Sequence, residues 1–190
     1  MLSVAPGFIP DGFCLRKYHH PVLSPLGNVQ DHDNLRNRDM SDITIRYARP
    51  EDIPRMCDLL TDLFSIESDF VADKKNQANG LNALLAEFPE RALVLVAVHG
   101  GTVVGMATVQ TLISTSEGGR VGFVEDVIVD RKFRGEGIGT LLLQEVIAWS
   151  RQSGIKRLQL LADITNQRAL DFYSSREWTH TRLICLRKFI

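Results

Sequence analysis

Apolar and polar residues begin to follow a regular pattern at Ile43, and the pattern predicts an ordered domain from there onward. Residues 43–47 alternate between apolar and polar, as in a half-buried strand. Pro50-Glu51-Asp52 then predicts the start of a helix, because proline suits a first turn and acidic residues suit its positive end. Apolar residues recur at helical spacing in two following segments: Ile53, Met56, Leu59, Leu60 and Leu63, then Leu81, Leu84, Leu85 and Phe88.

The second half of the chain alternates β-rich runs with helical patterns. The order predicted for the whole domain is strand, two helices, three strands, helix, strand, helix and strand. This order predicts a single mixed α/β (α+β) domain with a largely antiparallel central sheet flanked by helices. The predicted segments after the first two helices are strands at 92–98, 102–112 and 121–129, a helix from Ile138 to about Gly154, a strand at 157–161, a helix at 166–174 and a last strand at Thr181–Arg187.

Residues 1–39 show neither the strand period nor the helix period. Proline and glycine interrupt the first part, and the stretch from Asp31 to Asp39 is polar and charged. This composition predicts a flexible N-terminal extension. Met40 is a candidate translation start, so the folded domain is expected to span residues 40–190.

Composition excludes several classes of protein. With 22 Lys+Arg against 23 Asp+Glu, the chain lacks the basic excess of a dedicated nucleic-acid-binding protein. The three cysteines are far apart, which argues against a disulfide framework and against a zinc site. We find no apolar run of the ~18 residues that a membrane span requires and no secretory signal. A cytoplasmic protein without nucleic-acid or membrane partners is therefore expected.

The most informative segment is a glycine-rich turn between a strand and a helix. Gly135, Gly137 and Gly139 follow the strand that ends at Val129, and the amphipathic helix starts directly after them. Unpaired N–H groups and the dipole at a helix N-terminus bind phosphate, and glycines let the oxygens approach the main chain. Arg131, Lys132 and Arg134 add positive charge, so we predict a phosphate or pyrophosphate site here.

Two other nucleotide-binding motifs also contain glycines. A dinucleotide-binding Rossmann fold is disfavoured, because this turn comes late in the chain and after apparently antiparallel strands. A Walker phosphate loop is excluded, because no Lys-Ser or Lys-Thr pair follows the last glycine.

Two motifs resemble those of the GNAT superfamily of acyl-CoA N-acetyltransferases. Val129 with Arg134-x-x-Gly137-x-Gly139 is similar to the acyl-CoA signature of that family, and Asn166-x-x-Ala169-x-x-Phe172-Tyr173 is similar to its C-terminal helix pattern. The resemblance covers Ile43 to Ile190 and implies a GNAT-type fold. One departure is Glu177-Trp178, which stands where the family commonly has glycine and an aromatic residue.

The resemblance also implies a cofactor site for acetyl-CoA as co-substrate, without a metal. Main-chain groups of Val127, Ile128 and Val129 would pair with the pantetheine arm like an additional strand. Asn166 would form a hydrogen bond near the same arm, where the strands ending at Val129 and Leu161 diverge. Arg134 lies beside the pyrophosphate site, whose main-chain amides would come from Gly135, Glu136, Gly137, Ile138, Gly139 and Thr140.

The transfer of an acetyl group to an amine requires a proton donor for the thiolate and a neutral amine. Tyr173 is the candidate general acid, because the pKa of a phenol, about 10, is close to that of a thiol. The amide of Val127 is a candidate oxyanion donor. Glu125 is the candidate base, with a salt-bridged structural carboxylate as the alternative. Strand alternation predicts that Asp126, which would share a face with Val124 and Ile128, points away from Glu125.

The expected substrate is a primary amine of a small metabolite. Phe64, Glu67 and Phe70 are candidates for lining its pocket. Acetylation of a protein N-terminus or of lysine is the alternative activity, and a non-catalytic acyl-CoA sensor or a structural scaffold are the non-enzymatic alternatives. A homodimer is the expected assembly.

Overall fold

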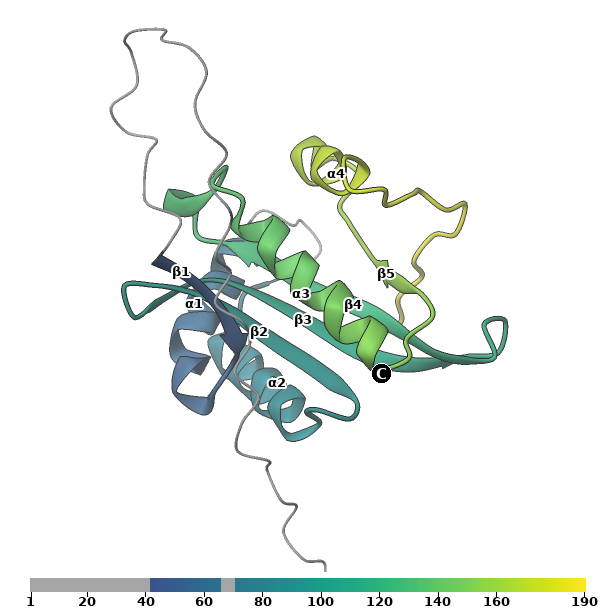
Figure 1. The fold of residues 1–190 in the computed structure, drawn as a ribbon, viewed down its shortest axis with the longest axis horizontal. Coiled ribbons are helices and arrows are strands. Elements are labelled where there is room, and N and C mark those ends of the chain that lie inside the picture. The colour runs from purple at the N-terminus through teal and green to yellow at the C-terminus, as the bar shows by residue number, and fades with distance from the viewer. Residues whose placement is uncertain (1–41, 66–70) are drawn as a thin grey trace, which may run out of the picture. The chain divides into compact units, whose positions relative to one another are not determined.

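The computed structural model describes residues 42–65 and 71–190. A five-stranded sheet runs through this part of the chain in the order β1-β2-β3-β4-β5 (Figure 1). Strands β1 to β4 are antiparallel to their neighbours, whereas β5 runs parallel to β4. The predicted α/β class and largely antiparallel sheet are confirmed. The strands are β1 (Ile43–Tyr47), β2 (Ala92–His99), β3 (Thr102–Ser114), β4 (Gly119–Val129) and β5 (Leu158–Leu160).

Helices cover both faces of the sheet (Figure 1). Helices α1 and α2 pack on one face, where Met56, Leu59 and Leu81 meet Val96 and Met106 in one apolar cluster. Helix α3 packs on the other face, in a second cluster. The helical segments are η2 (Pro50–Asp52), α1 (Ile53–Phe64), α2 (Lys74–Ala86), η3 (Arg131–Phe133), α3 (Ile138–Gln152) and α4 (Gln167–Ser174).

A buried carboxylate fixes the start of α1 against β1. The side chain of Asp52 accepts hydrogen bonds from both terminal nitrogens of Arg46, at 2.7 and 2.8 Å, and from the amide of Arg49 at 2.8 Å. The hydrogen bond from Arg46 lowers the pKa of Asp52, and burial partly opposes this effect. The acidic residue that was predicted to favour the helix N-terminus therefore forms a specific link between two elements.

A β-bulge interrupts the pairing of β3 with β4. Ala107 pairs with Val127 and Val109 pairs with Val124, so Glu125 and Asp126 lie opposite one residue, Thr108. Two residues opposite one define a bulge, and each bulge shifts the alternation of side chains beyond it by one position. This bulge lies in the strand that carries the predicted cofactor contacts.

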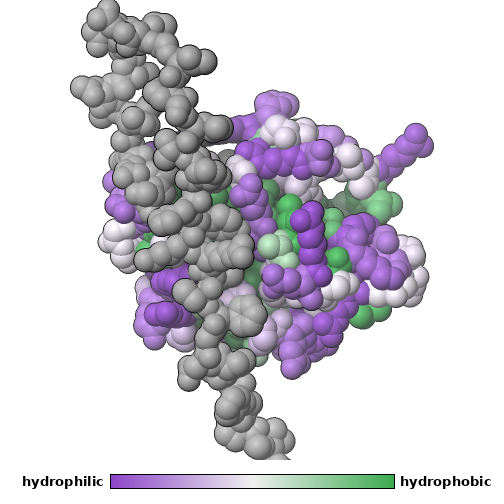
Figure 2. All heavy atoms as spheres, in the orientation of Figure 1, coloured by the Kyte–Doolittle hydropathy of each residue, from purple (hydrophilic) through white to green (hydrophobic). Residues whose placement is uncertain are grey.

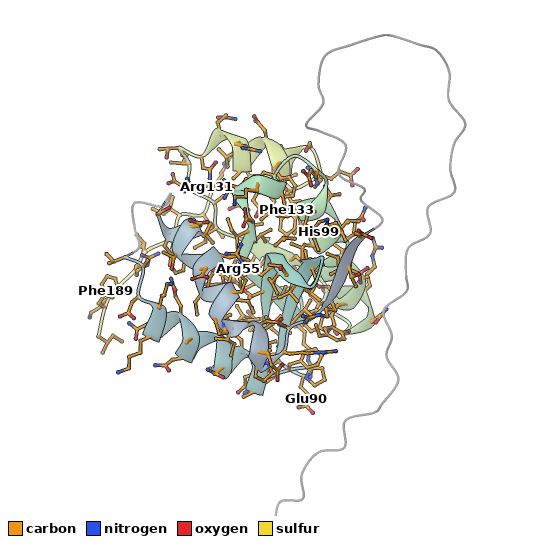
Figure 3. The ribbon with its side chains drawn as sticks, turned by 90° about the vertical axis from the view of Figure 1, so that its left-hand side faces the viewer. Arg55, Glu90, His99, Arg131, Phe133 and Phe189 are labelled. Atoms are coloured by element: carbon orange, nitrogen blue, oxygen red, sulfur yellow. The ribbon has the colours of Figure 1, made fainter. Side chains whose placement is uncertain are left out.

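The prediction of a last strand at Thr181–Arg187 is wrong. Residues 179–190 have no regular secondary structure, and their apolar side chains are exposed. Strand β5 is three residues long, so the described chain offers only a short edge for an additional strand. Apolar atoms are visible on the surface in Figure 2, and Figure 3 shows Phe189 at the periphery. The exposed fractions are 84% for Leu183, 81% for Ile184, 87% for Leu186 and 87% for Phe189.

Other segments match the predictions with small shifts in their bounds. Helix α2 ends at Ala86 and leaves Phe88 beyond it, and β5 is shorter than the predicted strand. The predicted hairpin turn is present, with Gly100 and Gly101 at positive φ. No helix of the described residues is long and apolar enough to cross a membrane. The predictions for residues 1–39, Met40, Glu67 and Phe70 lie outside the described residues.

Candidate active site

The predicted cofactor strand separates from its neighbour halfway along its length. In the described chain, β5 pairs with β4 only from Gly122 to Val124, and β4 continues to Val129. Gly122 permits the close approach before this divergence, because a Cβ there would lie 2.5 Å from Leu158 Cδ2. Val127, Ile128 and Val129 follow the divergence, as expected for main-chain groups that accept an extended ligand arm.

The turn after β4 has the backbone geometry that its glycines predicted. Gly135 and Gly137 have φ angles of 87° and 82°, and Gly137 is the N-cap residue of α3. Asp130 holds the preceding η3 turn, because its carboxylate accepts the amide of Lys132 at 2.9 Å and pairs with the Arg55 guanidinium. Figure 3 shows Arg131, Phe133 and His99 at the same end of the molecule, and the rings of Phe133 and His99 lie 5.3 Å apart.

The first turn of α3 contains the main-chain donors for an anion. The helix begins at Ile138, and its first internal hydrogen bonds run from the amides of Thr140 and Leu141 to the carbonyl of Gly137, at 2.9 and 3.1 Å. Amides that precede these bonds have no intrahelical acceptor. The turn therefore fits a phosphate group at Ile138 and Gly139. The amide of Thr140, which was predicted to bind the pyrophosphate, already has an acceptor in Gly137.

Positive charge surrounds this turn. Arg131 and Lys132 are exposed, and Arg134 is half-buried. The Arg134 Nε donates to the carbonyl of Val129 at 2.8 Å. Arg134 therefore holds the end of β4 in addition to placing its charge near the turn, and this bond occupies one carbonyl of the predicted pantetheine-binding segment.

Helix α4 carries the second motif against the first turn of α3. Asn166 is its N-cap, and the side-chain oxygen accepts the amide of Ala169 at 3.1 Å. The ring of Phe172 packs against Gly139, where a Cβ would lie 3.1 Å from Phe172 Cζ. Tyr173 is half-buried, with its ring 5.2 Å from that of Phe172 and 5.7 Å from that of Trp178.

Glu177 follows helix α4 and has a left-handed backbone conformation, although it is not glycine. The amide of Trp178 donates to the carbonyl of Tyr173, and the amide of Glu177 donates to that of Ser174, each at 3.2 Å. These two bonds are the Schellman pattern, in which the residue at the Glu177 position has positive φ and is usually glycine. Glu177 has a φ of 64°. The departure from the family pattern therefore changes the residue but keeps the turn.

We expect Glu177→Gly to raise the free energy of unfolding by about 1 kcal/mol, because a Cβ in the left-handed region costs about 1–2 kcal/mol and the greater freedom of unfolded glycine offsets part of this gain. Urea denaturation measures the change. Glu177→Ala is the matched control, since it removes the carboxylate but keeps the Cβ. Equal stabilisation by alanine would show that the side chain, and not the backbone angle, causes the effect.

The bulge corrects the predicted orientation of the two acidic residues. Val124 and Val127 both pack with the cluster beneath α3, whereas Ile128 packs with the cluster beneath α1. Glu125 alternates with Val124 and Asp126 alternates with Val127, and the two acidic residues together lie opposite Thr108. Both acidic residues therefore project toward the α1 face. The prediction that Asp126 shares a face with Val124 and Ile128, opposite Glu125, was wrong for Val124 and Glu125 because the bulge adds one residue, and it was right for Ile128.

The two acidic side chains have different surroundings. Asp126 is 9% exposed, and Thr108 binds it twice: the hydroxyl donates to the carboxylate at 2.9 Å and accepts the Asp126 amide at 3.1 Å. Glu125 is exposed, yet surrounding protein atoms remove part of its hydration and raise its pKa, an effect that the charge of Arg187 partly opposes. The two adjacent acidic residues therefore differ: Glu125 has a raised pKa, and Asp126 is held by hydrogen bonds.

Sequence reasoning missed three residues at this site. Thr108 binds Asp126, Trp178 packs against Tyr173, and Arg176 binds Thr140. The Trp178 position was noticed only as a departure from the family. No spacing signal identifies Arg176 or Thr108, because their partners lie on other elements.

Comparisons with known proteins agree with the fold. The family model described as Acetyltransferase (GNAT) family matches residues 53–177. The chain is 31% identical over 118 residues to an aminoglycoside N(6')-acetyltransferase type 1 of Stenotrophomonas maltophilia, with 60% of this chain and 72% of that protein covered. It is 27% identical over 142 residues to a glucosamine 6-phosphate N-acetyltransferase of Trypanosoma brucei brucei, with 71% and 88% covered.

The match to a third relative covers less than two thirds of that protein's length. An uncharacterized N-acetyltransferase of Methanocaldococcus jannaschii is 27% identical over 130 residues, and the match covers 68% of this chain but 58% of that protein. Among solved structures, a transcriptional regulator from Bacillus halodurans C-125 superposes with a TM-score of 0.68 at 24% identity, covering 77% of this chain and 99% of that one. This last similarity establishes the fold.

Proposed function

The chain belongs to the GNAT family of acetyltransferases, and from this premise we propose that it transfers the acetyl group of acetyl-CoA to a primary amine of a small metabolite. The observation that carries the proposal is the combination of two features at the end of β4. The strand extends beyond its pairing with β5, and the glycine turn with the open first turn of α3 follows directly.

The proposed binding roles follow from these groups. The main chain of Val127, Ile128 and Val129 binds the pantetheine arm, with Val127 also able to donate to an oxyanion. The phosphates lie at the α3 N-terminus, near the charge of Arg134. Asn166 contributes its side-chain amide nitrogen, because its side-chain oxygen caps α4.

We assign one catalytic role to a residue of β4, Glu125, and the other to a residue of α4, Tyr173. Glu125 accepts a proton from the ammonium group of the substrate, directly or through water, so that the neutral amine attacks the thioester carbonyl. Tyr173 donates its phenolic proton to the sulfur as the bond between carbon and sulfur breaks. Tyr173 packs between Phe172 and Trp178. This packing holds the phenol ring in a fixed orientation, which the proton transfer requires.

The names of two relatives support an amine substrate. One acts on glucosamine 6-phosphate and the other on an aminoglycoside, as their names state. The exposed carboxylate of Glu125 on β4 also favours a cationic substrate over an anionic one. A protein N-terminus or a lysine stays the alternative substrate. The homodimer and the cytoplasmic location stay predictions. The mass of the purified chain in solution, measured by sedimentation, tests the homodimer.

Calorimetric titration of acetyl-CoA into the purified chain tests the proposal, followed by thiol release with a panel of amines. We expect a Kd in the micromolar range and thiol release that depends on one class of amine. Gly137→Trp is expected to weaken binding at least about tenfold, because its side chain occupies the space in front of the amides that bind phosphate.

Gly154→Trp is the matched control. Gly154 also has a positive φ, 67°, and a Cβ there meets open space, but it lies beyond the opposite end of α3. Both variants carry similar backbone strain, so only the position differs. Failure of the folded wild type to bind acetyl-CoA would overturn the proposal. Equal weakening in both variants would remove the glycine turn from the site.

A further inference from the structure

Arg176 connects the helix of the candidate acid to the phosphate-binding turn. Its Nη2 and Nε lie 2.6 and 3.2 Å from the hydroxyl oxygen of Thr140, in the first turn of α3. Its Nη1 donates to the carbonyl of Phe172 at 2.7 Å and to the Ser175 hydroxyl at 2.8 Å. The guanidinium carbon also lies 3.9 Å from the centroid of the Phe172 ring.

The partners of the guanidinium come from two parts of the chain: Thr140 from α3, and Phe172 and Ser175 from the end of α4. Arginine presents its donors in a rigid planar fork, so hydrogen bonds on both sides fix the distance and angle between the groups that accept them. The Phe172 ring is held between Arg176 and Gly139. The next residue along α4 is Tyr173, so the same contacts fix where its side chain starts.

The chemistry of the Thr140 hydroxyl adds a second consequence. Arginine has no acceptor, so the Thr140 oxygen must accept both of the Arg176 hydrogen bonds. The Thr140 proton is then left to donate, and a neighbouring guanidinium strengthens that donation, because hydrogen bonds in a chain polarise one another. Thr140 lies in the turn that fits a phosphate, so the positive charge of Arg176 reaches this site through Thr140.

We propose that Arg176 is a positioning residue that couples phosphate binding at the first turn of α3 to the placement of Tyr173 on α4. This inference rests on the proposed function and extends it, because one side chain sets both the affinity for the phosphates and the alignment of the proton donor. Removal of Arg176 then weakens binding and lowers turnover together.

The test combines variants of both partners. We expect Arg176→Met, which keeps the length and the apolar contact, to raise the Kd for CoA about tenfold by calorimetry and to lower kcat about tenfold. Thr140→Val removes the acceptor from the other side and is expected to give changes of the same size. The double variant is expected to be no worse than either single variant, because interacting residues are not additive.

Two further variants separate positioning from charge alone. Arg176→Lys keeps the charge but loses the fork, so we expect it to restore most of the CoA affinity and little of kcat. Arg151→Met removes a different exposed arginine, in the last turn of α3, and is expected to change neither quantity. A Kd and kcat unchanged in both Arg176→Met and Thr140→Val, or fully additive effects in the double variant, would overturn the inference.

The experiment also separates this inference from the proposed function. If the wild type binds CoA and releases thiol while Arg176→Met behaves identically, only the coupling fails. If the wild type does not bind CoA, the acetyltransferase proposal itself fails. A loss of thermal stability in Arg176→Met without any change in CoA affinity shows a structural role and counts against the coupling.

Discussion

Replacing Tyr173 with phenylalanine lowers kcat about a thousandfold and leaves the Kd for CoA within about twofold, as expected for the loss of a general acid. The variant keeps the ring, so the contacts with Phe172 at 5.2 Å and with Trp178 at 5.7 Å are retained. Only the phenolic O–H is lost, and the thiolate must then leave without a proton from the enzyme. Steady-state thiol release measures kcat, and calorimetry measures the Kd.

The control for Tyr173→Phe is Tyr173→Leu. Leucine removes the ring as well, so it is expected to weaken CoA binding and to lower stability in addition to the loss of turnover. If phenylalanine retains more than about a tenth of the wild-type kcat, the acid role is wrong. The tyrosine then serves to pack α4 against Trp178.

Replacing Glu125 with glutamine lowers kcat about a hundredfold at neutral pH and removes the acidic limb of the pH profile, as expected for the loss of a general base. In the wild type, burial raises the pKa of Glu125 above its ordinary value. A base acts in its ionised form, so the wild-type rate falls as the pH drops through this raised pKa. The difference between the two proteins therefore shrinks at low pH.

The same raised pKa has a consequence for stability with the opposite sign. A carboxylate whose pKa is raised by folding stabilises the native state when it is protonated, and this contribution is lost as the pH rises through the folded-state pKa. Glutamine resembles the protonated form. Glu125→Gln is therefore expected to unfold at an equal or higher urea concentration than the wild type at neutral pH, although its activity is lower.

Asp126→Asn is the matched control, because Asp126 is adjacent and faces the same side of the sheet. Asparagine can still accept the hydrogen bond from Thr108. We expect this variant to retain the acidic limb of the pH profile. Loss of the limb in Asp126→Asn and its retention in Glu125→Gln would exchange the roles of the two residues.

Local signals predicted most of the fold. The helical spacing of Met56 and Leu59, the two glycines of the β2–β3 turn and the N-cap Asn166 all act within a few residues, so the sequence contains the information directly. The turn at Gly135 and Gly137 was also predictable from local sequence, because glycine has no side chain and so allows the positive φ angles found there.

Three features depended on residues far apart in the chain and could not be predicted. The bulge at Glu125 arises from the register between β3 and β4, and no local pattern marks it. The segment Thr181–Arg187 has the composition of a strand, but a strand also needs an edge to pair with. The Arg176–Thr140 contact joins residues 36 positions apart and depends on how α4 packs against α3.

The bulge decides which side chains of β4 face α3 and which face α1. Before it, Val124 faces α3; beyond it, Val127 and Val129 face α3 while Ile128 faces α1. If β4 kept its length and paired with β3 without the bulge, these faces would be exchanged, because side chains alternate with a period of two. Ile128 would then turn toward α3, and the two valines toward α1. The pairing of two residues with Thr108 is therefore as much a part of the site as the identity of any side chain in it.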